Sequence, residues 1–287
     1  MSKKVVLITG TNSGFGWLTA NSVAALGHKV YATMRDTKGK NVDKAQALSR
    51  IKNITVLDVS LTDDTSVQTA VETIINAEGT IDVLINNAGA AMFGVAESST
   101  TADIQRMFDI NFIAPWRLMK LVLPFMRKQS EGLIINVSSG YGRFSSPFSA
   151  VYSSSKFALE GLSEGLHYEV RPLGVDVAIL QPGAFPTEMS QKIQSGSDAS
   201  VAEDYQLIAE YPNKMFAAIG QMFETAKPDP QDVADAVVKL IGLPKGQRPL
   251  RTVVDPSTGE IVQTANDAVK VEYDKCLTAF GLEGLSK

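Results

Sequence analysis

Cysteine and histidine are scarce in this sequence, which has one cysteine, Cys276, and two histidines, His28 and His167. A single cysteine cannot form a disulfide within the chain, so the sequence favours a reducing compartment. These three side chains also fall short of the four ligands that a Cys/His zinc site uses, and we therefore expect no metal.

Long apolar runs and an excess of positive charge are missing as well. No run approaches the roughly 18–20 apolar residues that a membrane helix needs. Lys3 and Lys4 precede a short apolar run that meets Gly10, which leaves no room for the apolar region of a signal peptide. The formal net charge of −4 argues against a basic nucleic-acid-binding surface. We expect a cytoplasmic protein that neither spans a membrane nor binds nucleic acid.

Short runs of apolar, β-branched residues alternate with longer stretches of helical spacing through the first part of the chain. Such alternation predicts repeated βαβ units and a doubly wound α/β fold with a parallel sheet. A sheet strand buried on both faces has the length and composition of these runs. The expected strands are Val5–Thr9, Val30–Thr33, Ile54–Leu57, Val83–Ile85, Leu133–Val137, Val175–Leu180 and Leu250–Val254.

The expected helices include a long one whose apolar positions run from Ile104 to Phe125, bent at Pro115. No repeat or linker divides the chain, and 44% hydrophobic residues are enough for one core, so we predict a single domain over 1–287. Within it we expect a cofactor-binding part up to about 186, a substrate segment over about 187–228, and a helix and strand in 229–287.

The segment from Thr187 to Ala226 interrupts the alternation with a polar Gly/Ser patch and then an amphipathic stretch. An insertion of this length is typical of a lid or binding segment, although simple packing of one more helix on the core is an equal alternative. Its apolar side chains predict a hydrophobic ketone, aldehyde or secondary alcohol as substrate. They are Leu207, Ile208, Met215, Phe216, Ile219, Met222 and Phe223.

A glycine-rich turn joins the first expected strand to the helix that follows it. It reads Gly10-Thr11-Asn12-Ser13-Gly14-Phe15-Gly16. Glycines allow positive φ and a close approach of the backbone to a pyrophosphate, and the helix N-terminus adds free N–H groups. The turn predicts dinucleotide binding, although a purely structural turn would have the same glycines.

The second expected strand ends in Met34-Arg35 rather than in an acidic residue. At this place in a dinucleotide fold, a carboxylate binds the ribose 2′-hydroxyl, whereas an arginine suits a 2′-phosphate. The sequence therefore favours NADP(H) over NAD(H), against the alternative of a merely solvated Arg35.

Tyr152 and Lys156 lie four residues apart, which places both on one face of a helix. A nearby ammonium favours the phenolate and would make Tyr152 a usable general acid and base. Ser139, at the end of the preceding strand, is able to hydrogen-bond a substrate oxygen. A tyrosine–lysine pair alone is more often a surface pair, so the interpretation depends on the serine and the glycine-rich turn in the same chain.

Together these motifs resemble the short-chain dehydrogenase/reductase family of the single-domain type, in the family's order over about residues 5–190. The resemblance rests on Thr9-Gly10-x-x-x-Gly14-x-Gly16, Asp58-Val59, Asn86-Asn87-Ala88-Gly89, Asn111, Asn136-Val137-Ser138-Ser139, Tyr152-x-x-x-Lys156 and Pro182-Gly183-x-x-x-Thr187. The stretches around Arg35 and Lys156 look most like its hydroxysteroid and retinol dehydrogenase branch. The resemblance implies a seven-stranded Rossmann sheet of order 3-2-1-4-5-6-7 and NAD(P)-dependent oxidation or reduction of an alcohol/carbonyl pair.

The resemblance also implies a role for each matching residue. Tyr152 would be the acid/base, Lys156 would lower its pKa and hold the nicotinamide ribose, Ser139 would orient the substrate, and Asn111 would bind a water. The remaining matches would contact the cofactor: Asp58 and Val59 the adenine, Asn87, Ala88 and Gly89 its middle, and Pro182, Gly183 and Thr187 the nicotinamide end. Phe15 departs from the family, which usually has Ile or Leu there.

Two other functions remain open on the sequence. One is a catalytically silent NADPH sensor that engages partners, which the complete Ser139, Tyr152 and Lys156 set argues against. The other is an epimerase or dehydratase, which more often has a different glycine spacing and a larger C-terminal domain. Family members often pair through the helices around Ile104–Met126 and Tyr152–Arg171, so we expect a homodimer or homotetramer. The second of these helices has more apolar side chains than packing one face against the sheet requires, which supports association: Phe157, Leu159, Leu162 and Leu166.

Overall fold

The computed structural model describes residues 3–286 and contains one seven-stranded sheet in which every strand is parallel to its neighbours. Its order is β3-β2-β1-β4-β5-β6-β7, as the resemblance implied. The strands lie within two residues of the expected runs at either end. Their bounds are β1 Val5–Thr9, β2 Lys29–Met34, β3 Ile54–Asp58, β4 Val83–Asn86, β5 Gly132–Val137, β6 Val175–Pro182 and β7 Arg251–Val254.

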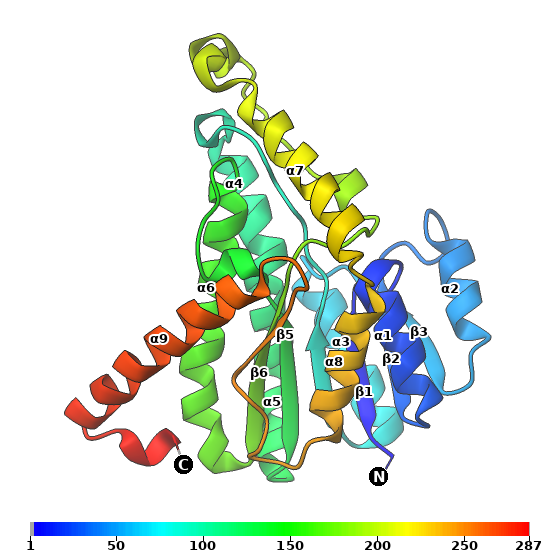
Figure 1. Cartoon of the computed structure of the whole chain (residues 1–287). Helices are drawn as coiled ribbons and strands as arrows, with labels where there is room; N and C mark the ends of the chain where they lie inside the picture. The colour runs from blue at the N-terminus through cyan, green and yellow to red at the C-terminus, as the bar shows by residue number, and fades with distance from the viewer. Residues whose placement is uncertain (1–2, 287) are drawn as a thin grey trace.

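Helices cover both faces of this sheet, which makes a three-layer, doubly wound fold (Figure 1). One face is covered by α1 (Gly14–Ala25), α2 (Val42–Ser49) and α8 (Gln231–Gly242). The other is covered by α3 (Asp64–Glu78), α5 (Ala114–Lys128) and α6 (Ala150–Val170). The remaining helices are α4 (Thr101–Phe108), α7 (Tyr211–Ala226) and α9 (Gly259–Ala279).

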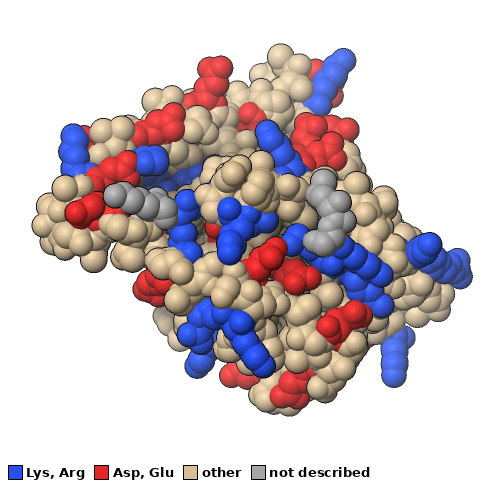
Figure 2. All heavy atoms as spheres, turned by 90° about the horizontal axis from the view of Figure 1, so that it is seen from below, with Lys and Arg blue, Asp and Glu red and all other residues tan. Residues whose placement is uncertain are grey.

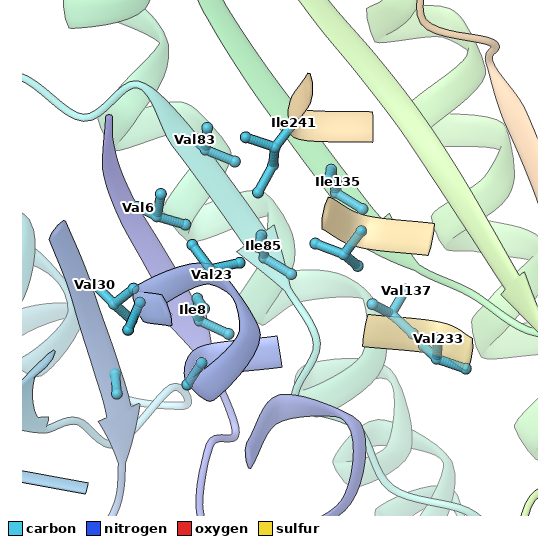
Figure 3. Close-up of a cluster of buried hydrophobic side chains, with 14 of the residues drawn as sticks. Val6, Ile8, Val23, Val30, Val83, Ile85, Ile135, Val137, Val233 and Ile241 are labelled. Carbon is cyan, nitrogen blue, oxygen red and sulfur yellow. The ribbon is translucent and has the colours of Figure 1, made fainter. Parts of the chain in front are cut away.

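Successive residues of the central strand β1 enter opposite cores. Val6 and Ile8 pack with α1 and α8 on one face (Figure 3), whereas Val5 and Leu7 pack with α3 and α5 on the other. Because side chains alternate along a strand, a strand buried on both faces must be apolar at nearly every position. This double burial explains why continuous apolar runs identified the strands.

The long helix expected from Ile104 to Phe125 is irregular just before Pro115. α4 continues through a single turn of π-helix, Asp109–Ile113, into α5, and Pro115 lies in the first turn of α5. A proline has no N–H to donate to the carbonyl oxygen four residues earlier, here that of Asn111, and its ring crowds that oxygen. The π-turn, which contains Asn111, therefore lies where the proline disturbs the α-helical hydrogen bonds.

The segment after β6 differs from the single amphipathic helix that its sequence predicts. Leu207 and Ile208 belong to a separate 3₁₀ segment, Ser200–Ile208, and α7 begins only at Tyr211. No residue of α7 is fully buried, and the helix projects beyond the carboxyl ends of the strands (Figure 1). It therefore does not pack as a core helix.

Basic and acidic residues are interspersed on the face of the molecule at the amino ends of the strands (Figure 2). Some of the cations lie at helix ends, such as Arg127 and Lys128 in the last turn of α5 and Arg171 after α6. Positive charge there opposes the negative end of the helix dipole, so these residues have a structural explanation. None of the helices within residues 3–286 has the length and apolarity needed to cross a lipid bilayer.

Candidate active site

The candidate site lies where the direction of the strand order reverses, between β1 and β4. In open parallel sheets, the connections leaving the carboxyl ends of two such strands run in opposite directions and open a crevice between them. The glycine-rich turn follows β1 and Asn87–Gly89 follow β4, so the fold brings these two motifs together.

The glycine-rich turn is packed too tightly for side chains at two positions. Gly10 has φ +68°, and a Cβ there would lie 2.8 Å from the Cα of Ala88. A Cβ on Gly16 would overlap the carbonyl oxygen of Gly10. Glycine at these two positions therefore lets the turn pack closely on the loop after β4 and on itself, in the tight conformation that a pyrophosphate-binding turn adopts.

Thr9 and Asn87 hold the two motifs against each other. The hydroxyl oxygen of Thr9 accepts hydrogen bonds from the backbone N–H groups of Asn87 and Ala88, each at 3.0 Å. The Asn87 amide donates to the carbonyl oxygen of Thr9 at 2.8 Å and to that of Gly10 at 3.2 Å. The Asn87 side chain thus shapes the wall of the crevice from behind.

The rest of the turn is fixed by neighbours on both sides. Thr11 donates its backbone N–H and its hydroxyl to the carbonyl oxygen of Thr33, and Asn12 donates to the side chain of Asn41. Helix α1 starts after Ser13, whose side chain makes no capping hydrogen bond, so the first N–H groups of the helix remain available for an anion.

Phe15, the departure from the family pattern, has a packing partner. Its ring meets Phe185 edge to face, with centroids 5.4 Å apart. Phe185 belongs to the loop after β6, the same loop in which Thr187 lies beside Gly14. The larger ring therefore ties the glycine-rich turn to the start of the substrate segment and leaves the chemistry unaffected.

In the loop after β2, Arg35 is exposed and the carboxylates of Asp36 and Asp58 accept hydrogen bonds from the loop itself. Arg35 is exposed, and its guanidinium has no ion-pair partner among residues 3–286. The carboxylate of Asp36 accepts the backbone N–H of Lys40 at 2.8 Å. Asp58 accepts hydrogen bonds from the backbone of Asp36 and from the backbone and hydroxyl of Thr37, and these bonds hold the pKa of its carboxyl below the usual range.

The adenine contacts that the resemblance implies for Asp58 and Val59 stay predictions. The exposed Asp58 carboxylate also holds the Arg35 loop in place. The Val59 side chain is buried in the core, and its backbone N–H donates to Met34 at 2.9 Å. Val59 therefore offers a nucleotide only its backbone.

Tyr152 and Lys156 lie on one face of α6, next to the end of β5. Both side chains are buried, and the Lys156 ammonium lies 5.9 Å from the centre of the Tyr152 ring. The ammonium donates to the carbonyl oxygen of Val137 at 2.9 Å. Ser139 hydrogen-bonds the Tyr152 hydroxyl, and its own oxygen accepts the backbone N–H of Tyr141 at 3.1 Å. The fold thus assembles the three residues that the sequence pointed to.

Desolvation by burial is the largest influence on the pKa values of both Tyr152 and Lys156. It raises the pKa of Tyr152, a shift that the hydrogen bond from Ser139 opposes. Burial lowers the pKa of Lys156 to about 8, and the charge of Glu160 opposes that shift. The sequence predicted that Lys156 lowers the pKa of Tyr152, but in this structure desolvation outweighs any such effect. Tyr152 is therefore a neutral phenol at physiological pH, which is the form that donates a proton.

Asn111 lies in the π-helical turn and links three elements of the site. Its amide oxygen accepts the backbone N–H of Ala90 at 2.9 Å, and its amide nitrogen donates to the carbonyl oxygen of Ala90 and to the Ser155 hydroxyl, each at 2.9 Å. A Cβ on Gly89 would lie 3.3 Å from the Asn111 oxygen and 3.6 Å from the Lys156 nitrogen. The Asn111 side chain therefore positions the loop after β4, and its implied role as a water ligand stays a prediction.

Aromatic rings form one wall of the site above Tyr152. Phe93 stacks on Tyr152 with centroids 6.0 Å apart and meets Phe216 of α7 at 5.8 Å. Tyr141 meets Tyr152 edge to face at 6.5 Å. Phe93 was not predicted from the sequence, because an isolated aromatic residue in a loop has no periodicity or motif that would identify it.

Hydrogen bonds anchor the first half of the substrate segment and the loop that leads into it. Gly183 packs on the Asp255 carboxylate, directly after Pro182 ends β6. Further along, Gln194 exchanges backbone hydrogen bonds with Ala91 and Phe93, each at 2.9 Å. The next anchor is Asp103, which accepts the Ser197 backbone N–H at 3.0 Å and its hydroxyl at 2.6 Å. These bonds hold the pKa of Asp103 well below its usual range.

Several known proteins are similar to this chain in sequence. A family model described as short chain dehydrogenase matches residues 4–198. The chain is 40% identical over 205 residues to a 3-ketodihydrosphingosine reductase from Bacteroides thetaiotaomicron, covering 71% of this chain and 72% of that protein. It is 34% identical over 256 residues to retinol dehydrogenase 8 from Bos taurus, covering 86% and 80%.

Solved structures lead to the same family. A short-chain dehydrogenase from Streptomyces avermitilis has a TM-score of 0.74 and 30% identity, and the match covers 98% of this chain and 97% of that one. Other solved structures with this fold contain NADP in some cases and NAD in others. A nicotinamide cofactor is therefore supported, and the similarity to retinol and hydroxysteroid dehydrogenases expected from the sequence is confirmed.

Proposed function

The chain belongs to the short-chain dehydrogenase family, and from this premise we propose that it is an NADP(H)-dependent oxidoreductase acting on a hydrophobic ketone, aldehyde or secondary alcohol. The observation that carries the proposal is the convergence of Ser139, Tyr152 and Lys156 beside the glycine-rich crevice. When bound, the nicotinamide donates or accepts the hydride. The remaining requirements, orientation and proton transfer, fall to residues of this chain.

The crevice has the features that a dinucleotide needs. Gly10 and Gly16 allow the tight turn, and the N–H groups at the start of α1, which no side chain caps, are available to a pyrophosphate. In this proposal, residues up to about 186 form the cofactor part, with Asn87–Gly89 along the middle of the cofactor. Pro182, Gly183 and Thr187 lie toward the nicotinamide end.

Tyr152 is the proton donor and acceptor in this proposal. Its raised pKa keeps the phenol protonated at neutral pH, which suits donation to the oxygen of a carbonyl as that oxygen becomes an alcohol. Ser139 contacts the Tyr152 hydroxyl, so an oxygen held by Ser139 lies beside the proton that it receives. The Lys156 ammonium stabilises the phenolate that remains.

The preference for NADP(H) rests on the loop after β2. A 2′-phosphate needs a cation, and the Arg35 guanidinium is exposed there without an ion-pair partner in the described chain. A free ribose 2′-hydroxyl binds well to a carboxylate, and Asp36 and Asp58 already accept backbone hydrogen bonds of the same loop. The loop therefore favours a phosphate over a ribose hydroxyl.

The hydrophobic substrate follows from the wall around Tyr152. Phe93 and Tyr141 contact its ring, Phe216 contacts Phe93, and the sulfur of the half-buried Met215 lies 3.9 Å from the Ser146 hydroxyl. Such a lining favours apolar skeletons. The names of two relatives given above, a 3-ketodihydrosphingosine reductase and a retinol dehydrogenase, also point to apolar substrates.

The direct test is NADPH oxidation, followed by absorbance against a panel of hydrophobic ketones and aldehydes, with NADH in parallel. We expect turnover of at least one hydrophobic carbonyl and a preference for NADPH. Tight NADPH binding without turnover of any member of the panel would favour the silent sensor. Turnover restricted to sugars or phosphorylated compounds would contradict the substrate class.

The projecting part of the substrate segment is expected to act as a lid. Replacing Met215 and Phe216 with alanine should raise the KM for bulky ketones several-fold and leave the melting temperature nearly unchanged, because no α7 residue is fully buried. Hydrogen exchange should be fast from about Ser200 to Ala226 and slower around the Asp103 anchor. A large loss of stability with unchanged substrate preference would instead show that α7 is a packing element.

Association into a dimer or tetramer is expected, although for a narrower reason than the sequence suggested. Leu159 and Leu166 are buried within the protomer and Leu162 packs against its core, so of the four residues only Phe157 is exposed, at 44%. Around it Ile104, Ile113 and Trp116 are also exposed, on α4, the π-turn and α5. Light scattering at micromolar concentration should give at least twice the 30.8 kDa of one chain. A monomer under these conditions would contradict the expectation.

A further inference from the structure

A buried carboxylate lies one helical turn beyond Lys156. Tyr152, Lys156 and Glu160 follow one another at intervals of four residues on α6, so all three side chains share one face of the helix. Glu160 is 3% exposed, although an unpaired carboxylate in such a place would be strongly destabilising. Its presence there needs an explanation that the family motifs do not give.

Three elements from later in the chain hold Glu160. One of its oxygens accepts a hydrogen bond from the Gln181 amide of β6, and the other accepts one from the Arg251 guanidinium of β7, each at 2.9 Å. Arg251 also donates to Glu164 at 3.1 Å. The Asn266 amide of α9 donates to Gln181 at 2.7 Å. Each of the two carboxylate oxygens of Glu160 therefore has a hydrogen-bond donor.

The loop that carries Ser139 packs directly on this carboxylate. A Cβ on Gly142 would lie 2.9 Å from the Cγ of Glu160 and 2.5 Å from the Ser138 hydroxyl. One residue later, Arg143 faces Glu160, Glu164 and Arg251. Glu160 therefore touches both halves of the candidate active site, the serine loop and the helix of Tyr152 and Lys156.

Cations outnumber carboxylates around Lys156 even with Glu160 present. The described group contains three cations, Lys156, Arg143 and Arg251, and two carboxylates, Glu160 and Glu164. The Nη2 atoms of both arginines are buried without a hydrogen-bond partner. Lys156 itself has one hydrogen bond, to a neutral carbonyl. Removal of Glu160 leaves three cations against one carboxylate, Glu164, which is partly exposed.

We propose that Glu160 is a positioning residue for Lys156, whose buried carboxylate keeps the neighbouring ammonium charged and in place, and that Arg251 and Gln181 hold Glu160 for this purpose. The inference rests on the proposed function, in which Lys156 acts as a cation. It adds a residue outside the motif set and gives β7 and α9 a part in the chemistry. Glu160 acts through Lys156 and does not touch the reacting atoms.

The sign of the expected pH effect follows from the charge on Lys156. An ammonium with a pKa of about 8 is lost as the pH rises through 8, so activity should fall on the basic side of the pH profile. In Glu160→Gln the amide oxygen still accepts a hydrogen bond, but the negative charge is gone. The pKa of Lys156 should then fall, and the basic limb of kcat/KM should move to lower pH by about one unit.

Matched variants separate this effect from a structural role. Glu164→Gln removes the other carboxylate bound to Arg251, one turn farther from Lys156, and should leave the basic limb unchanged. Glu160→Asp keeps the charge and should restore the limb most of the way. If Glu160→Gln is too unstable to study, the double variant Glu160→Gln with Arg251→Gln also removes the buried cation that Glu160 binds, leaves only the partly exposed Glu164 without its partner, and should show a shift in the same direction.

A second readout is independent of turnover. The side-chain methylene resonances of ¹³C-labelled lysine report the pKa of Lys156 by NMR titration, with Lys156→Met to assign the signal. Equal Lys156 titration midpoints in the wild type and in the Glu160→Gln or double variant would overturn the inference. A lower midpoint in these variants, with no turnover in any variant or in the wild type, would support the Glu160–Lys156 coupling and contradict the proposed function alone.

Discussion

Replacing Tyr152 with phenylalanine is expected to lower kcat about 10²–10⁴-fold, because this change removes the proton donor and leaves the ring in place. The ring is held by Phe93 on one face and Tyr141 at its edge, contacts that phenylalanine keeps. NADPH binding, measured by the fluorescence of the nicotinamide, should change little. The measurement is the initial rate of NADPH oxidation at saturating ketone.

Tyr141→Phe is the matched control, since it removes a hydroxyl from the same aromatic wall. Tyr141 contacts Tyr152 only through its ring, and the variant should keep most of its activity. A Tyr152→Phe enzyme with near-normal turnover would show that another group transfers the proton. Equal losses in both variants would assign the effect to the packing of the wall.

Replacing Arg35 with alanine is expected to weaken NADPH binding about 10- to 150-fold, as for the loss of a charge-assisted hydrogen bond of about 1.5–3 kcal/mol. NADH has no 2′-phosphate, so its affinity should change little. Dissociation constants for both cofactors, from fluorescence titration, give the comparison. The result should be a variant that no longer prefers NADPH.

Arg127→Ala provides the control for net charge. It removes the same charge from an exposed arginine at the opposite end of the sheet and should leave both affinities as they are. Equal weakening of NADPH and NADH by Arg35→Ala would mean that Arg35 does not bind the phosphate. The cofactor preference would then need another explanation than the loop after β2.

The sheet was predictable from the sequence because its strands are buried on both faces. Each strand, such as β1 or β6, must then be apolar along its whole length, and the pattern stands out against the helices. The glycine-rich turn and the Tyr152–Lys156 pair were also predictable, since their chemistry depends on residue type and short spacing. The strand order came from the family resemblance.

Other features depend on contacts between distant parts of the chain. The π-turn at Asn111 has one indirect signal, Pro115, which predicts that the helix is irregular but not the form of the irregularity. The involvement of Asp58 in the Arg35 loop depends on backbone hydrogen bonds that only the folded loop forms. Glu160 had one local signal, an acidic residue at the Tyr152–Lys156 interval, but its partners lie in β6 and β7.

Glu160 gains its partners only late in the synthesis of the chain. Tyr152, Lys156 and Glu160 leave the ribosome well before Arg251 and Asn266, which belong to the last elements of the chain. A chain that stops before Arg251 contains every motif of the family, yet it buries Glu160 without its cation and Gln181 without its donor. The stable surroundings of Lys156 are therefore completed only when the C-terminal strand and helix have been synthesised and have docked.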